Sequence, residues 1–205
     1  MTEPAAGRRP LRPWPGTAAI AAVLLDRDGT VNVKAAEGRY ITSPAELVLL
    51  PGAAEAIAQL NAASVQVILV TNQRWLSTMT DLAPYERVHE RLGELLADCG
   101  ARLDDAYYCP HAADSCRCRK PAPGMLKRAA EEHLFSLANA VMIGDSESDV
   151  QAGRAAGTAT IVLSATPDPP SPADHAVPNL AEAVRLILGE RGRPRPVKSG
   201  YPSCA

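Results

Sequence analysis

The stretch AAIAAVLL (18–25) runs directly into DRDGT (26–30), and this junction decides the fold class. An unbroken apolar run is typical of a strand that is buried on both faces of a parallel sheet, because a half-exposed strand would alternate with polar residues. Two further runs end in the same way: VQVILV (65–70) precedes TNQ (71–73), and ANAVMI (138–143) precedes GD (144–145). Each predicted strand therefore carries polar residues at its carboxyl end.

Helical patterns fill the intervals between these strands, and another strand is predicted at 158–163. Alternating strands and helices predict an α/β fold with a doubly wound, Rossmann-like parallel sheet, whose ligands bind beyond the carboxyl ends of the strands. The proline-rich stretch 165–178 is interpreted as an extended surface loop. The helices are predicted at 52–63, 84–99, 123–134, 147–156 and 179–188.

The 205 residues suit about one domain, which we place at 18–189. The Pro/Arg-rich tail (1–17) and the basic tail (190–205) have the composition of disordered segments. Without them, 14 basic and 21 acidic residues leave a net charge near −7, which argues against nucleic acid as a partner. No apolar run is long enough for a membrane span and no secretory signal is apparent, so we expect no membrane partner and a cytoplasmic location.

Four motifs occur in a fixed order along the chain: DRDGT (26–30), TNQ (71–73), RKPAPG (119–124) and GDSESD (144–149). Together they resemble the motifs of the haloacid dehalogenase superfamily of phosphatases. The resemblance implies that Asp26 is a nucleophile that forms an aspartyl-phosphate, while Asp28 exchanges protons with the leaving alcohol and the attacking water. Because this attack sets one anion against another, a divalent cation such as Mg²⁺ is expected.

The same resemblance assigns the remaining roles. The Mg²⁺ ligands are expected to be the Asp26 side chain, the Asp28 backbone carbonyl and the Asp145 side chain, with Asp149 supporting the metal site indirectly. Thr71 is expected to hold the transferring phosphoryl group. Lys120 is expected to pair with the nucleophile and with the phosphoryl oxygens, where a fixed ammonium offsets the developing charge.

A cluster of thiols lies just before the third motif. Cys109, His111, Cys116 and Cys118 provide three sulfurs and an imidazole, which is a complete tetrahedral set for a structural Zn²⁺. A disulfide and unpaired thiols are the alternatives, but disulfides are rare in a reducing compartment, and unpaired thiols leave the clustering unexplained. We therefore predict a zinc-binding loop at 109–118.

The zinc loop narrows the resemblance to the family of heptose-1,7-bisphosphate 7-phosphatases and histidinol-phosphate phosphatases, over roughly residues 20–165. This implies no large cap domain and a small phosphorylated metabolite as the partner. Asn72 and Arg119 are expected to contact the substrate, and the planar guanidinium group of Arg119 suits a second phosphate or substrate hydroxyls. The chain departs from the family where RWLSTM (74–79) replaces a glycine-containing loop. Trp75 is predicted either to contact a sugar or to be a local packing anchor.

Several functions remain open on this basis. A heptose bisphosphate is the first candidate substrate, followed by histidinol phosphate or another sugar phosphate, while a polynucleotide 3′-phosphatase fits the acidic domain less well. A zinc-stabilised binding protein without turnover is the alternative from another class. It is disfavoured because every motif residue needed for chemistry is present. Such a chain is expected to work as a monomer.

Overall fold

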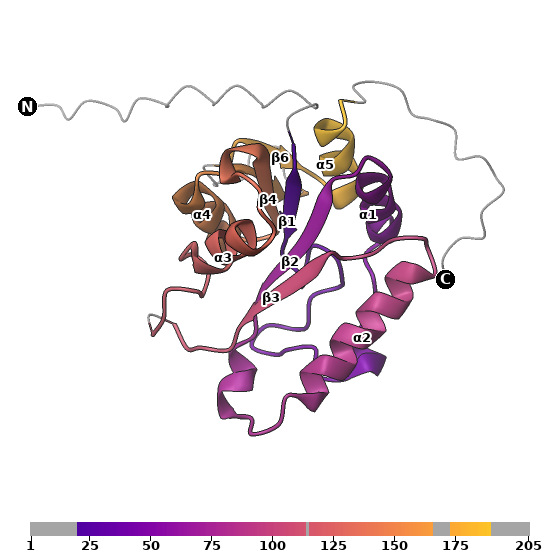
Figure 1. The fold of residues 1–205 in the computed structure, drawn as a ribbon. Coiled ribbons are helices and arrows are strands. Elements are labelled where there is room, and N and C mark those ends of the chain that lie inside the picture. The colour runs from indigo at the N-terminus through magenta and orange to yellow at the C-terminus, as the bar shows by residue number, and fades with distance from the viewer. Residues whose placement is uncertain (1–19, 114, 166–172, 190–205) are drawn as a thin grey trace, which may run out of the picture.

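The computed structural model describes residues 20–113, 115–165 and 173–189, so both predicted tails lie outside the described residues. Six parallel strands form one sheet in the order β3-β2-β1-β4-β5-β6 (Figure 1). This order confirms the doubly wound α/β prediction, with β1 at the point where the strand order reverses. The strands are β1 (Ala22–Leu25), β2 (Gln66–Asn72), β3 (Asp105–Cys109), β4 (Ala140–Gly144), β5 (Ala159–Leu163) and β6 (His175–Val177).

Helices cover both faces of the sheet, and α3 and α4 lie on the opposite side from α1 and α5 (Figure 1). The side chains of β1 alternate between two hydrophobic clusters: Val23 and Leu25 join the one shared with α1, α2 and α5, while Ala22 and Leu24 join the one shared with α3. Burial on both faces explains why this strand is a continuous apolar run. The helices are α1 (Ala53–Ala62), α2 (Ala83–Ala97), α3 (Gly124–Glu132), α4 (Glu147–Ala156) and α5 (Leu180–Ile187).

The register of the central strands brings the polar strand ends together. Leu25 of β1 is level with Leu69 of β2 and with Ile143 of β4. The residues that follow these three positions therefore lie at the same end of the sheet, toward the carboxyl ends of neighbouring strands. This end of the central strands, where the strand order reverses, is the place where the fold class predicts that ligands bind.

Two strands were not predicted from the sequence. β3 is an edge strand, and its residues alternate between buried and partly exposed, so DAYYC lacks a continuous apolar run. β6 is only three residues long and lies within the stretch 165–178, which we had interpreted as a loop. That interpretation is therefore wrong for His175–Val177, where parallel pairing with β5 defines a strand that is too short to show a hydrophobic pattern in the sequence.

The described segments at the carboxyl ends of the strands are loops with short 3₁₀ helices at Pro44–Glu46 and Arg74–Thr78, and they include no separate cap domain. In the described part of the chain, no helix has both the length and the apolar character needed to cross a membrane.

Candidate active site

Asp26 lies at the centre of the strand ends. Its backbone N–H donates to the carbonyl of Ile143 at 2.9 Å, which holds the residue against β4. The side chain is almost completely buried, and its Oδ1 lies 2.6 Å from Nζ of Lys120. Burial raises the pKa of Asp26, and the ammonium of Lys120 opposes that rise. The ion pair with Lys120 opposes protonation, but burial outweighs it, so the pKa of Asp26 rises to about 7.

Lys120 joins segments that are far apart in the sequence. Its buried ammonium contacts Asp26, lies 2.6 Å from Oδ1 of Asp149, and donates to the carbonyl of Val70 at 2.7 Å. Burial alone would lower the pKa of Lys120, but the charges of the two carboxylates raise it. The lysine is therefore a fixed cation that is shared by two acidic residues.

Asn72, at the end of β2, holds the backbone of this lysine. Its Oδ1 accepts from the Lys120 N–H at 3.1 Å, and its Nδ2 donates to the Lys120 carbonyl at 3.0 Å. Both polar atoms of the side chain are thus used within the protein. This geometry gives Asn72 a positioning role, and its predicted contact with substrate stays a prediction.

Asp28 is held by three side chains. Arg27 Nη2 donates to both carboxylate oxygens at 3.1 and 3.0 Å, and Asn32 Nδ2 donates to Oδ1 at 3.0 Å. The third donor is Gln73, whose Nε2 lies 2.9 Å from Oδ2. Arg27, Asn32 and Gln73 are all buried, so the Asp28 carboxyl group is fixed from within the fold while it remains partly exposed on its other side.

Asp145 follows β4 and faces the turn at Gly29. Gly29 has a φ of +91°, and a Cβ atom at this position would overlap the Asp145 carboxylate, so both the turn and the close approach require glycine. Oδ2 of Asp145 lies 2.8 Å from Nζ of Lys34, whose side chain is 57% exposed. Oδ1 is buried and has no hydrogen-bond partner among the described residues.

The donor set at this edge suits a hard divalent cation. Carboxylate oxygens of Asp26, Asp145 and Asp149 lie within 4.8 Å of one another. Together with the unpartnered Oδ1 of Asp145, they provide oxygen ligands of the kind that Mg²⁺ prefers. These residues therefore fit the ion that the sequence predicts.

Asp149 is buried one helical turn into α4. Its Oδ2 accepts from the Ser146 hydroxyl at 2.6 Å and from the Ser146 N–H at 3.1 Å, and the second of these bonds belongs to a capping box at the start of the helix. Gly144 makes room for this carboxylate, because a Cβ atom there would overlap it. With its other oxygen on Lys120, Asp149 connects the helix start to the lysine.

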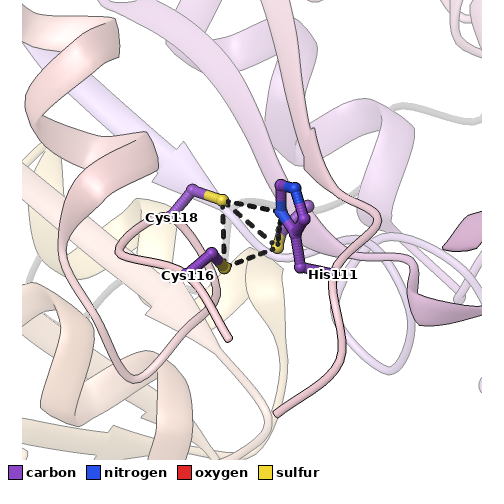
Figure 2. A group of neighbouring side chains, drawn as sticks. His111, Cys116 and Cys118 are labelled. Carbon is purple, nitrogen blue, oxygen red and sulfur yellow. Dashed lines mark hydrogen bonds between the residues drawn. The ribbon is translucent and has the colours of Figure 1, made fainter. Parts of the chain in front are cut away.

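The second ligating cluster lies in the loop between β3 and α3, where the side chains of His111, Cys116 and Cys118 turn toward one another (Figure 2). Cys109 completes the group from the end of β3, and the distances between neighbouring sulfur and Nδ1 atoms are 3.2–3.6 Å. A tetrahedral zinc with bond lengths of about 2.0–2.3 Å needs its donors roughly 3.3–3.8 Å apart. The cluster therefore fits zinc.

The thiols of this cluster differ in acidity. Burial raises the pKa of Cys109 to about 12. Burial also acts to raise the pKa of Cys116, but the backbone N–H of Arg119 and the neighbouring thiols outweigh it and lower this pKa to about 7. A bound cation favours the thiolate form at every sulfur.

Comparison with known proteins identifies the family. A family model described as haloacid dehalogenase-like hydrolase matches residues 6–157, which is more than half of the chain. The chain belongs to the haloacid dehalogenase-like hydrolases. Two curated relatives are called D-glycero-beta-D-manno-heptose-1,7-bisphosphate 7-phosphatase. The one from Bordetella bronchiseptica is 40% identical over 67% of this chain and 76% of its own length, and the one from Photorhabdus laumondii is 36% identical over 84% and 98%.

Solved structures agree with this assignment within the haloacid dehalogenase-like hydrolases. The D,D-heptose 1,7-bisphosphate phosphatase of B. bronchiseptica, crystallised with magnesium and phosphate, has a TM-score of 0.73 at 32% identity and covers 83% of this chain and 99% of its own. The enzyme of the same name from Burkholderia thailandensis has a TM-score of 0.62 at 29% identity, over 82% and 97%.

The other residues that we predicted for this haloacid dehalogenase-like site are Thr71, Arg119 and Trp75, and they differ in burial. Thr71 is fully buried, and its Oγ1 accepts from Nε2 of Gln73 at 2.8 Å, the same group that donates to Asp28. Arg119 is partly buried, and its Nη1 donates to the carbonyl of His111 at 3.3 Å, which ties it to the zinc loop. Trp75 lies in the 3₁₀ helix after β2, and its indole Nε1 donates to Oε1 of Gln73 at 2.7 Å.

Sequence reasoning missed four residues that contact the site: Arg27, Asn32, Lys34 and Gln73. Arg27 lies inside the DRDGT motif and Gln73 inside the TNQ motif. Their position beside predicted site residues was the signal that could have identified them. Asn32 and Lys34 follow DRDGT in a segment without periodicity. Only the folded turn, in which the Gly29 N–H donates to the Asn32 carbonyl at 2.8 Å, brings them back to the carboxylates.

Proposed function

We propose that this protein is a Mg²⁺-dependent phosphatase that acts on a phosphorylated sugar, most of all on D-glycero-D-manno-heptose 1,7-bisphosphate at its 7-phosphate. The observation that carries this proposal is that Asp26, Asp28, Thr71 and Lys120 meet Asp145 at the carboxyl ends of three neighbouring strands. The names and similarity of the relatives support the substrate.

In the first half of the proposed reaction, an oxygen of Asp26 attacks the phosphorus atom and the bond to the sugar oxygen breaks. Asp28 gives its proton to that oxygen, so the sugar leaves as an alcohol. Lys120 remains charged beside the nucleophile, and its ammonium offsets the negative charge that collects on the phosphoryl oxygens. The hydroxyl of Thr71 orients the transferring group.

In the second half, the carboxylate of Asp28 removes a proton from a water molecule, whose oxygen attacks the phosphorus of the aspartyl-phosphate. The bond between phosphorus and Asp26 breaks, which releases inorganic phosphate and regenerates both carboxyl groups. Donors from Arg27, Asn32 and Gln73 hold Asp28 at one position through both halves.

Two metals complete the proposal. Asp26, Asp145 and the backbone carbonyl of Asp28 would hold Mg²⁺, which neutralises charge between the nucleophile and the phosphate group. Cys109, His111, Cys116 and Cys118 would hold a structural Zn²⁺, because four protein ligands leave no open coordination position.

The test is phosphate release with Mg²⁺ from both anomers of heptose 1,7-bisphosphate, histidinol phosphate, simple sugar phosphates and a 3′-phosphorylated oligonucleotide. The Asp26→Asn variant provides the blank. We expect a preference of about a hundredfold in kcat/KM for one heptose bisphosphate, equivalent to about 2.7 kcal/mol. Release no faster than the blank from every compound would contradict the proposal, and a preference for histidinol phosphate would replace the substrate.

We also propose that residues 18–189 form the catalytic domain, that it works as a monomer, and that it is cytoplasmic. The described elements run from Ala22 to Ile187, which supports these limits. A chain cut to 18–189 is expected to keep the kcat/KM of the full chain and to elute as a monomer in size-exclusion chromatography with light scattering. Loss of turnover on truncation would assign a role to the tails.

A further inference from the structure

Trp75 is hydrogen-bonded to Gln73, the residue whose side chain orients Asp28. Its indole Nε1 donates to Oε1 of Gln73 at 2.7 Å. Gln73 is completely buried, and its Nε2 donates both to Oδ2 of Asp28 at 2.9 Å and to Oγ1 of Thr71 at 2.8 Å. The loop in which this chain departs from its family therefore reaches the proposed catalytic groups through one side chain.

The chemistry of these groups allows only one orientation of the Gln73 carboxamide. An indole N–H can only donate, so it must face the oxygen of the carboxamide. The NH₂ group then faces Asp28 and Thr71, and each of its two hydrogens has one acceptor. The reversed carboxamide would set its NH₂ group against the indole N–H and its oxygen against the Asp28 carboxylate. No water can relieve those contacts, because Gln73 has an exposed fraction of 0%.

This orientation has a consequence for both neighbours. Gln73, which follows β2, donates to the Asp28 carboxyl group in addition to Arg27 and Asn32. Oγ1 of Thr71 accepts from Gln73, so the hydroxyl hydrogen of Thr71 points elsewhere and can be donated to a phosphoryl oxygen. We propose that Trp75 is a positioning residue, whose indole N–H fixes Gln73 and thereby the Asp28 carboxyl and Thr71 hydroxyl groups; the inference rests on the proposed function.

This role separates from the two that the sequence suggested for Trp75. Contact with a sugar and local packing both depend on the aromatic ring, whereas positioning depends on the indole N–H. Trp75→Phe retains an aromatic ring and removes the donor. Ser77→Ala, an exposed change in the same 3₁₀ helix, is the matched control.

The experiment measures kcat and KM for the wild type, Trp75→Phe, Ser77→Ala, Gln73→Met and the Trp75→Phe/Gln73→Met double variant. Loss of one hydrogen bond of about 1 kcal/mol predicts about a fivefold lower kcat for Trp75→Phe, with KM changed less than twofold. Because Trp75 acts through Gln73, the Phe substitution should have no further effect on kcat once Gln73 is methionine. Ser77→Ala should match the wild type.

A kcat for Trp75→Phe within twofold of the wild type overturns the inference. So does a raised KM at unchanged kcat, which would indicate a sugar contact, or an equal loss in both Gln73 backgrounds, which would indicate packing.

A second measurement does not need turnover. The Gln73 side-chain NH₂ signals in NMR should exchange with water faster in Trp75→Phe than in the wild type. An inactive wild type with protected NH₂ signals would contradict the proposed function alone, whereas unchanged exchange in Trp75→Phe would overturn the positioning role.

Discussion

The two ligating clusters of this molecule are held in place by different means. The charge of the Asp26, Asp145 and Asp149 carboxylates is offset in part by two ammonium groups that the fold supplies, from Lys120 inside and Lys34 at the edge. The cluster of three thiols and an imidazole is held by contacts among its own members and by the Arg119 N–H. The carboxylate cluster is thus organised by charged side chains from other segments, whereas the thiol cluster is organised within one short loop.

The difference between the two clusters indicates what kind of metal binding each one suits. A carboxylate cluster whose charge is already offset in part can gain and lose a metal and a phosphate without losing its shape, which suits repeated turnover. A closed set of four donors in one short loop suits a cation that stays bound. The following predictions test this division, beginning with the largest expected effect.

Asp26→Asn should reduce kcat on the order of 10³-fold or more, because an amide is too weak a nucleophile to form the aspartyl intermediate. Its melting temperature should not fall, since Lys120 keeps Asp149 as a partner. Phosphate release and differential scanning calorimetry measure the two properties. Activity within tenfold of the wild type would exclude Asp26 as the nucleophile.

Lys120→Met should destabilise the protein by about 3–5 kcal/mol, because it leaves two buried carboxylates without their cation. Urea unfolding measures this loss of free energy. Adding Asp149→Asn to the variant removes one of the stranded charges and should recover part of the stability. A double variant no more stable than Lys120→Met would show that the lysine does not act through charge.

Cys116→Ser should abolish stoichiometric zinc and lower the free energy of unfolding by about 2–3 kcal/mol, or roughly 5–10 °C in Tm. Ser115→Ala in the same loop is the matched control and should retain its zinc. Metal analysis of protein purified without added metal, together with thermal unfolding, provides the measurement. A wild-type protein that contains no zinc would contradict the assignment of this cluster.

Lys34→Gln should strengthen Mg²⁺ binding by up to about fivefold, because an exposed ion pair contributes at most about 1 kcal/mol. The ammonium of Lys34 contacts Oδ2 of Asp145 and so competes with a cation at that carboxylate. Isothermal titration calorimetry with Mg²⁺ measures the affinity directly. Arg39→Gln, an exposed change in the same segment, should bind as the wild type does; weaker binding by Lys34→Gln would mean that Lys34 supports the metal site.

The two clusters also differ in how far the sequence alone predicts them. The thiol cluster lies within ten residues, so its spacing is visible in the sequence. The strands that end at Asp26, Thr71 and Asp145 were predictable because they are buried on both faces. The half-exposed β3 and the three-residue β6 were not, since pairing with a neighbouring strand rather than hydrophobic pattern defines them.

The parts of the site that escaped prediction depend on tertiary contacts. Arg27 and Gln73 carry no signal of their own, and only the meeting of the β1 and β2 ends shows that both donate to Asp28. Lys34 reaches a carboxylate 111 positions away in the sequence. No local pattern encodes such a pair, because its two members are related only by the order of the strands.

The contacts of the Lys120 ammonium depend on the folding of segments that are far apart in the sequence. Its pair with Asp26 spans 94 positions of sequence, and its pair with Asp149 connects the end of β1 with the start of α4. Because closing such a long chain loop costs conformational entropy, the pairs are held only when the strands and α4 around Lys120 are packed together. A partly folded chain therefore has an unpaired nucleophile, and chemical competence arises together with the complete tertiary structure.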